Sequence, residues 1–155
     1  MARSSWLTPA QERAWRALQF MQMRLDAELA RRIAADSQLS YPDYIVLVAL
    51  TDRPDGRLRL FELVNVLGWE KSRVSHQVSR MVERGLVAKK KCDTDRRGAF
   101  IVVTALGKRE IAAAAPGHVE AVRTLFVDKL TPAQIAAIGD AAEAVLTGLG
   151  EVPGD

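Results

Sequence analysis

The chain contains 155 residues, the length of one domain or of one small domain with long appendages. Hydrophobic residues make up 48% of it and charged residues 26%, which excludes intrinsic disorder as its main state. No stretch free of charged residues exceeds ten residues, about half the length of a membrane span. The start of the sequence shows no basic segment followed by an apolar run, so we expect no signal peptide and a cytoplasmic protein.

Basic residues are concentrated in the middle of the chain. Between Arg53 and Arg109 there are 14 Lys and Arg against 6 Asp and Glu, whereas the remainder holds 8 basic and 13 acidic residues. A basic middle between acidic ends indicates contact with a polyanion such as nucleic acid. An Arg-rich solvated surface would give the same balance, so charge alone leaves both interpretations open.

The tetrapeptide Thr-Pro-Ala-Gln occurs twice, at 8–11 and 131–134, and both copies predict the start of a helix. Thr would cap the helix, Pro suits its first position, and Gln three residues on would complete a capping box. Apolar residues then recur at helical spacing, which predicts one helix over about 9–36 and another over about 132–148.

Shorter elements are predicted between these two helices. The sequence Ser-Tyr-Pro-Asp at 40–43 is a third capping pattern, which favours a short buried helix over a strand for the apolar run that follows. Apolar spacing predicts a helix over 60–67 that ends at Gly68, and another over 71–84. Because β-branched residues and a charged turn come next, we expect a hairpin with strands at 86–92 and 99–104.

The last helical stretch is expected to run from Thr104 to Leu130, with a kink or break near Ala115 because Pro116-Gly117 follows. The order helix, helix, helix, helix, hairpin, helix, helix predicts a mainly α fold with a small β-hairpin wing. A short helix, a tight turn, a polar-faced helix and a hairpin together form a winged helix-turn-helix, whose second helix enters the DNA major groove.

The two terminal helices are too long to wrap a small core, so their apolar stripes need a partner. We therefore expect N- and C-terminal dimerisation helices at 1–38 and 108–155 around a DNA-binding domain at 39–107. A monomeric helical bundle is the alternative.

The helix over 71–84 carries side chains suited to reading base edges. Arg can donate two bonds to guanine and Gln can pair bidentately with adenine, while Ser and His can reach bases or phosphates. The candidate recognition-helix residues are Ser72, Arg73, Ser75, His76, Gln77 and Arg80.

The hairpin adds a second basic group. An Arg on a thin β-turn fits the narrow minor groove, and strand lysines can hold phosphates. A run of lysines on an edge strand also protects against edge-to-edge pairing. The candidate wing residues are Lys89, Lys90, Lys91, Asp95, Arg96 and Arg97.

Four segments follow one another in a specific order: EKSRVSHQV at 70–78, RGLV at 84–87, DRRG at 95–98 and VTALG at 103–107. In this order they resemble the MarR family of bacterial transcriptional regulators, and the opening of the chain resembles actinobacterial members. The resemblance implies a homodimer whose two winged domains grip a pseudo-palindrome in double-stranded DNA. It also implies that Arg97 is the minor-groove arginine, that Asp95 braces it, and that Arg96 meets phosphate.

We therefore expect a DNA-binding transcriptional regulator, a homodimeric repressor relieved by a small aromatic or lipophilic effector. A transcriptional activator of the same fold is one alternative. A winged-helix module for protein partners is another, although it predicts apolar residues on the exposed helix face. Trp15, Arg16, Phe20 and Tyr44 are candidates for lining an effector cleft, but core packing explains most of them equally well, so the ligand-binding residues stay unknown.

No enzyme activity, cofactor or metal is expected. The sequence has no Gly-rich phosphate loop, no H-E-x-x-H and no Gly-x-Ser-x-Gly. One cysteine and two histidines cannot fill a four-ligand zinc site. Cys92 has no resolving cysteine, so a redox role for it is a minor alternative, and we expect a structural or solvated role for His118.

Overall fold

The computed structural model describes residues 6–91 and 98–150 of the chain. These ranges hold six α-helices and a three-stranded sheet, which confirms the predicted mainly α fold with a small wing. In chain order the elements are α1 (Pro9–Asp36), α2 (Tyr41–Thr51), β1 (Arg57–Arg59), α3 (Leu60–Leu67), α4 (Lys71–Glu83), β2 (Val87–Lys91), β3 (Ala99–Val103), α5 (Ala105–Leu125), the 3-10 helix η1 (Val127–Lys129) and α6 (Pro132–Leu149).

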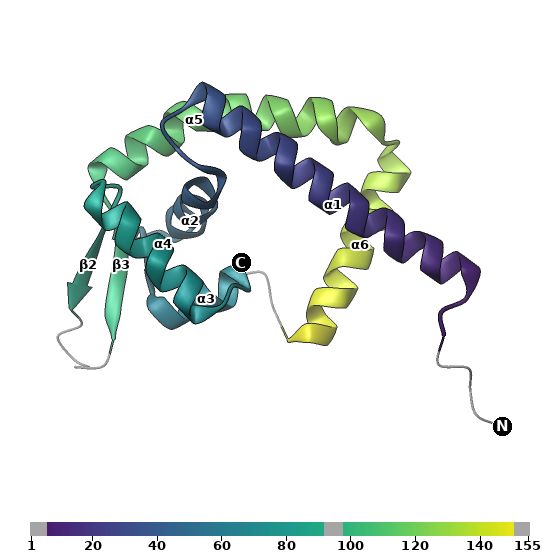
Figure 1. Ribbon diagram of the computed structural model, residues 1–155, viewed down its shortest axis with the longest axis horizontal. Helices are drawn as coiled ribbons and strands as arrows, with labels where there is room; N and C mark the ends of the chain where they lie inside the picture. Colours follow the sequence, from purple (N-terminus) through teal and green to yellow (C-terminus); the bar gives the residue numbers. More distant parts are fainter. Residues whose placement is uncertain (1–5, 92–97, 151–155) are drawn as a thin grey trace.

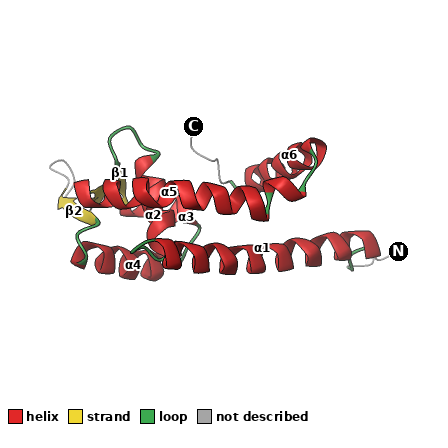
Figure 2. Ribbon diagram, turned by 90° about the horizontal axis from the view of Figure 1, so that it is seen from above, coloured by secondary structure: helices red, strands yellow, loops and turns green. Residues whose placement is uncertain are grey.

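The elements form an arch. Figure 1 shows α5 across the top, α1 running diagonally below it toward the N-terminus, α2, α3, α4 and the strands below one end, and α6 descending from the other. Figure 2 shows α5 running beside α1, and these two long helices pack on each other. The winged helix-turn-helix therefore lies at one end of a long helical pair.

Three helices begin at the capping boxes that the sequence predicts. At α1, Oγ1 of Thr8 accepts a hydrogen bond from the backbone N–H of Gln11, whose side chain accepts one from the N–H of Thr8. The repeat at 131–134 does the same for α6, and Ser40 with Asp43 does so for α2. Each box satisfies two backbone donors that a helix start leaves open, which fixes where the helix begins.

The strands pair antiparallel in the order β1-β3-β2, with Leu58 opposite Ile101 and Val87 opposite Val103. The predicted hairpin is confirmed by β2 and β3. The sequence pattern does not predict β1, a strand of only three residues with one buried side chain. Such a short edge strand exists because it pairs with β3, and that pairing has no local signal.

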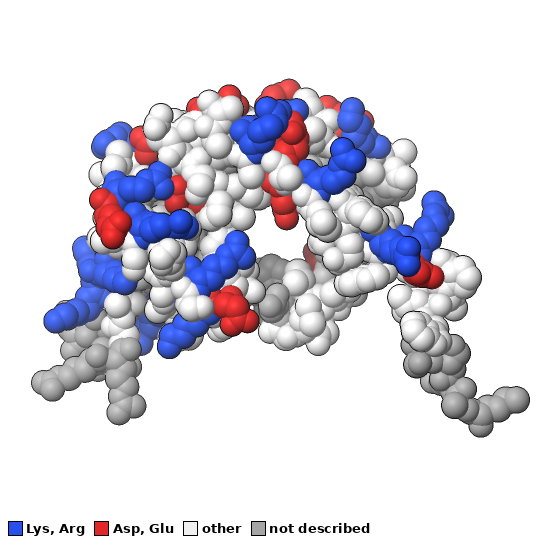
Figure 3. All heavy atoms as spheres, viewed as in Figure 1, with Lys and Arg blue, Asp and Glu red and all other residues white. Residues whose placement is uncertain are grey.

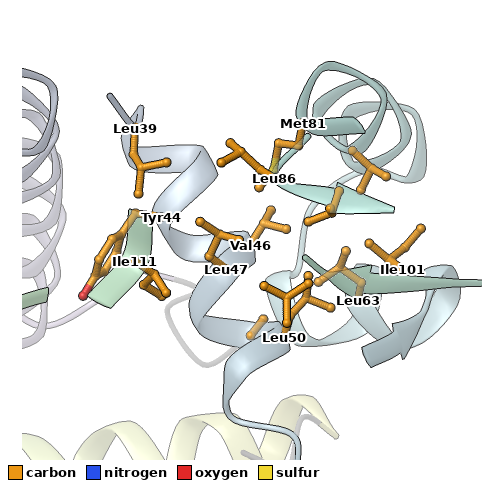
Figure 4. Close-up of a cluster of buried hydrophobic side chains, with 14 of the residues drawn as sticks. Leu39, Tyr44, Val46, Leu47, Leu50, Leu63, Met81, Leu86, Ile101 and Ile111 are labelled. Atoms are coloured by element: carbon orange, nitrogen blue, oxygen red, sulfur yellow. The ribbon is translucent and has the colours of Figure 1, made fainter. Parts of the chain in front are cut away.

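The hydrophobic core lies around α2. Val46, Leu47 and Leu50 of this helix are fully buried in one cluster with Leu63 of α3 and Met81 of α4. Figure 4 shows these side chains converging between α2, α3, α4 and the sheet. Burial of each large apolar side chain stabilises the fold by about 1.5–3 kcal/mol, so this cluster holds together the end of the molecule formed by α2, α3, α4 and the sheet, here called the winged end.

α5 begins in tight contact with the hairpin. Oγ1 of Thr104 accepts from the backbone N–H of Gly107 at 3.0 Å and donates to the carbonyl oxygen of Gly85 at 2.6 Å. A Cβ on Gly107 would overlap the carbonyl oxygen of Leu86. The first turn of α5 is therefore fixed against the segment that joins α4 to β2.

Of the kink or break expected near Ala115, the break is wrong. α5 is one helix from Ala105 to Leu125 with Pro116 inside it, drawn in Figure 1 as a single bowed element. Proline removes the hydrogen bond to the carbonyl four residues earlier, that of Ala112. Because Ala112 is exposed, water can satisfy this carbonyl, and the helix on both sides is held by Ala114 and Ala121, which are buried.

Large apolar side chains remain exposed on both terminal helices. Within the described protomer, α6 has no buried residue. The exposed apolar residues are Trp15, Leu18, Phe20, Met21 and Met23 on α1 and Ile135, Ile138, Val145 and Leu149 on α6. Within residues 6–91 and 98–150, none of the helices combines the length and the hydropathy that a membrane span needs.

Candidate nucleic-acid interface

The turn between α3 and α4 depends on one glycine. Gly68 ends α3 in the left-handed region, with φ of 62°, and its N–H donates to the carbonyl oxygen of Val64 at 3.0 Å. Residues with a side chain rarely adopt this backbone conformation, whereas glycine adopts it readily. Trp69 and Glu70 then complete the turn, and α4 begins at Lys71. The helix-turn-helix arrangement is thus built from a glycine C-cap and a short connection.

The two sides of α4 differ sharply. Val74, Val78 and Met81 are fully buried against the core, which confirms the predicted apolar side. Four of the six predicted recognition residues are exposed and Ser75 is half-buried; the exposed ones are Ser72, Arg73, His76 and Arg80. These side chains can therefore meet a ligand without any change in the core.

The predicted exposure of Gln77 is wrong. This side chain is only 3% exposed, and its Nε2 donates to Oδ1 of Asp43 on α2 at 2.6 Å. Its position, three residues after Val74 and four before Met81, places it on the buried side of the helix. Gln77 therefore cannot present both of its amide atoms to a base edge, and it makes contacts inside the protein.

Arg73 is held over an aromatic ring. Its guanidinium carbon lies 4.0 Å from the centroid of Trp69, a cation–π arrangement between the turn and the first turns of α4. The stacked guanidinium keeps its N–H edges available while its rotamers are restricted. Sequence reasoning named Arg73 but not Trp69, whose position four residues earlier was the available signal.

The three hairpin lysines do not share one face of the sheet. Lys89 lies opposite Ile101, on the face that carries the core, and Lys91 follows on the same face. Lys90 lies opposite Phe100, on the other face. All three are exposed, so the wing presents positive charge on both of its sides.

Two arginines that sequence reasoning missed lie over Phe100. The guanidinium carbons of Arg57 and Arg59 are 4.6 Å and 5.1 Å from the centroid of this ring. Both arginines belong to β1, and Arg59 is the register partner of Phe100. Together with Lys90 they make the outer face of the sheet basic. They share this face because they alternate around the buried Leu58 in the strand, and the strand itself forms through its pairing with β3.

Positive charge gathers at the winged end. Figure 3 shows many Lys and Arg over the end that carries α4 and the strands, with several Asp and Glu between them on this face. The predicted tip residues Asp95, Arg96 and Arg97, as well as Cys92, lie outside the described residues. The structure therefore places the recognition helix and the strand lysines at the same end of the molecule.

Other candidate sites are less well formed. Among the described residues, no group of three or more His, Cys, Asp or Glu is arranged to hold a metal ion. Of the proposed cleft residues, Tyr44 is buried in the core, whereas Trp15 and Phe20 are exposed on α1. The structure gives these residues no common cleft to line, so no effector site follows from them.

Comparison with known proteins agrees with this geometry. The family model of the MarR family matches residues 37–98, which include α2, α3 and α4. The MarR family transcriptional regulator Sco3205 of Streptomyces coelicolor, solved in complex with DNA, is 34% identical, and the match covers 96% of this chain and 93% of that one with a TM-score of 0.89. The chain belongs to the MarR family. AbsC, another MarR family regulator of Streptomyces coelicolor, is 33% identical over 94% of this chain and 98% of its own, with a TM-score of 0.86.

Curated relatives match a shorter region. Transcriptional regulator HosA of Escherichia coli O127:H6 is 32% identical over 78 residues, which are 50% of this chain and 56% of that protein. The chain thus spans about half the length of the curated relatives it matches. For this MarR-family chain, the solved structures therefore supply the comparison over the terminal helices, and they confirm the winged helix-turn-helix architecture.

Proposed function

We propose that this chain is a sequence-specific DNA-binding transcriptional regulator that acts as a homodimeric repressor at a pseudo-palindromic operator. Residues 39–107 form the DNA-binding domain in this proposal, and residues 1–38 and 108–155 form the dimer. The observation that carries the proposal is the row of exposed polar and basic side chains on α4 beside a lysine-bearing hairpin.

The two parts of this surface have different roles in the proposal. Side chains on α4 reach base edges in the major groove, where Arg73 and Arg80 can each donate two bonds to guanine. The hairpin contacts the phosphate backbone and the minor groove, which adds affinity but little sequence information. The proposed DNA contacts are Ser72, Arg73, Ser75, His76 and Arg80 on α4 and Lys89, Lys90, Lys91, Arg96 and Arg97 on the wing, with Asp95 bracing Arg97. The relative Sco3205 was solved with DNA, which supports this assignment.

A second copy of the chain is the proposed partner of the exposed apolar side chains. Trp15 and Phe20 on α1 are 55% and 63% exposed, and Val145 and Leu149 on α6 are 62% and 68% exposed. Exposed apolar side chains in this number are typical of an interface. A two-fold dimer that covers both helices would place two copies of α4 about one DNA turn apart, roughly 34–36 Å.

Repression would follow if the dimer blocks polymerase at an overlapping promoter. We further propose that a small aromatic or lipophilic molecule releases the operator. This part rests on membership of the family, and the residues that would hold the molecule stay unassigned. Its test is the operator affinity measured against a panel of aromatic acids, of which at least one is expected to weaken binding.

The proposal is tested by selecting bound sequences from random duplex DNA with the purified chain, at about 150 mM salt. A two-fold-symmetric motif with half-sites about 10 base pairs apart is expected. Arg73→Ala is expected to lower operator affinity by about 1–3 kcal/mol and to relax the preference at one base pair of each half-site.

Arg13→Ala is the matched control, because it removes the same charge from an exposed position in the first two turns of α1, and this end of α1 lies far from α4 in Figure 1. This variant is expected to keep both affinity and preference. Weak binding that is lost at higher salt concentration and yields no motif would contradict the proposal. Equal losses of operator affinity in Arg73→Ala and Arg13→Ala would also contradict it.

A further inference from the structure

One buried carboxylate connects α2 to the recognition helix α4. Asp43 is only 1% exposed. Its Oδ1 accepts from Nε2 of Gln77 at 2.6 Å, and its Oδ2 accepts from Nη1 of Arg84 at 2.6 Å and from the backbone N–H of Ser40 at 2.8 Å. A buried charge is tolerated only when it is paired and hydrogen-bonded, so these donors explain how Asp43 is accommodated.

The chain of contacts continues from Asp43 to an exposed arginine. Oε1 of Gln77 accepts from Nη2 of Arg80 at 2.6 Å. The amide of Gln77 thus donates on one side and accepts on the other. Rotating it by 180° would set its oxygen against the carboxylate of Asp43 and its NH₂ group against the guanidinium. Both contacts would be repulsive, so Asp43 determines which atom of Gln77 faces Arg80.

Arg80 is the member of the recognition surface that this arrangement orients. It lies on the exposed side of α4, one turn after Gln77, and one corner of its guanidinium is bound to the protein. A long side chain loses rotamer freedom when it binds a partner, and a side chain that is already anchored loses less. An anchored guanidinium also presents its remaining N–H groups in one direction, which bidentate pairing with guanine requires.

We propose that Asp43 and Gln77 are positioning residues that set the orientation of Arg80 for base reading. This inference rests on the proposed function, because it assumes that Arg80 meets a base. It assigns a role to two buried side chains that do not themselves touch DNA. It also makes specificity at one base pair depend on a contact between α2 and α4.

The test compares Gln77→Met with Arg80→Ala on the selected operator and on duplexes with one base pair changed at each position. Methionine has similar length and removes the acceptor for Arg80. Gln77→Met is expected to lower operator affinity roughly tenfold and to flatten the preference at the same base pair as Arg80→Ala, with unchanged affinity for random DNA. The double variant is expected to match Arg80→Ala alone, because the effect of Gln77 passes through Arg80.

Ser40→Ala is the matched control for stability. It removes the hydroxyl that caps α2 next to the same carboxylate and leaves the contacts of Asp43 with Gln77 and of Gln77 with Arg80 in place. It is expected to lower the melting temperature and to keep the base preference. If Gln77 only supported the fold, Gln77→Met would, like Ser40→Ala, lower the melting temperature and keep the base preference.

A second measurement needs no substitution in the network. The ¹⁵N relaxation of the Arg80 side chain in the free wild-type chain is expected to show restricted motion, in contrast to the exposed Arg109 on α5. Equal mobility of the two side chains would overturn the inference.

The outcomes separate the two proposals. If the chain selects no operator, or if Arg80→Ala leaves every preference unchanged, the reading role of Arg80 fails and this inference fails with it. If the operator and the Arg80 effect are present but Gln77→Met keeps the preference, or adds to Arg80→Ala in the double variant, the inference alone is overturned.

Discussion

The ring of His118 on α5 lies against the ring of Tyr44 on α2, with the two centroids 4.6 Å apart. Nδ1 of His118 is buried and has no hydrogen-bond partner among the described residues. Tyr41 packs nearby, and Arg32 and Asp36 of α1 line the small cavity beside the imidazole. This histidine is therefore part of the packing between the long helical pair and the winged end, as a structural role predicts.

Burial lowers the pKa of His118 below its ordinary value of 6.5. The unfolded chain then takes up a proton on this residue at a higher pH than the folded chain does. The free energy of unfolding is therefore expected to fall as the pH drops through 6.5 toward the lower folded-state pKa. Urea unfolding of wild type and His118→Leu from pH 7.5 to pH 5 is the measurement; the variant keeps His76 and is expected to lose less stability. Parallel curves for the two chains would assign the acid sensitivity to another group.

Gly107→Ala is expected to destabilise the fold by about 1–3 kcal/mol or more, because the added Cβ overlaps the backbone of Leu86 and backbone cannot move aside cheaply. Gly117→Ala is the control in the same helix. Its Cβ would meet only Oδ2 of Asp36, at an ordinary 3.8 Å, so it is expected to be neutral or to stabilise by up to about 1 kcal/mol. Thermal unfolding of both variants measures the difference. Similar melting temperatures would show that α5 shifts easily against the hairpin.

Lys90→Ala is expected to weaken binding to all DNA sequences alike and to reduce the dependence of log affinity on log salt by about one unit. The reason is that Lys90 lies on the outer face of the wing, where it can neutralise a phosphate but reads no base. Affinities at several salt concentrations, on the operator and on random DNA, measure both quantities. Lys129→Ala, which removes the same charge from η1, is expected to leave the slope unchanged. A loss confined to one operator sequence would assign Lys90 to base reading instead.

Ile138→Asp is expected to shift the chain from dimer to monomer at micromolar concentration, since it places a charge on an exposed apolar position of α6. Sedimentation equilibrium measures the assembly. Within the described protomer α6 buries no residue, so the circular dichroism spectrum is expected to remain helical. A variant that stays dimeric would place the dimer contact elsewhere, and a wild-type monomer would contradict the proposed dimer itself.

Most of the fold could be predicted because its boundaries have local causes. The capping boxes at Thr8, Ser40 and Thr131 and the glycine at position 68 determine helix ends within a few residues of themselves. Features that depend on distant contacts could not be found this way. The strand β1 exists through its pairing with β3, and α5 continues past Pro116 because its flanks are packed.

In the candidate site, too, features with local causes could be predicted and features that depend on distant contacts could not. The exposed positions of α4 follow from helical spacing, and they include Arg73 and Arg80. The prediction places Gln77 on the wrong side of α4 because its amide suggests base pairing, although its spacing from Val74 and Val78 indicates burial. What decides its role is Asp43, which lies 34 residues earlier in the chain and meets it only in the folded protein.

The lack of room for a side chain at Gly107 has a mechanical consequence. The first turns of α5 cannot slide along the start of the hairpin without breaking the backbone contact at Leu86 and the hydrogen bonds of Thr104. We therefore expect the first turns of α5 to move together with α4 as one rigid unit. In the proposed dimer, Pro116 is the position of α5 that lacks a backbone hydrogen bond, so bending there would change the separation of the two winged domains. The operator spacing that the protein accepts would then be set by the flexing of one helix.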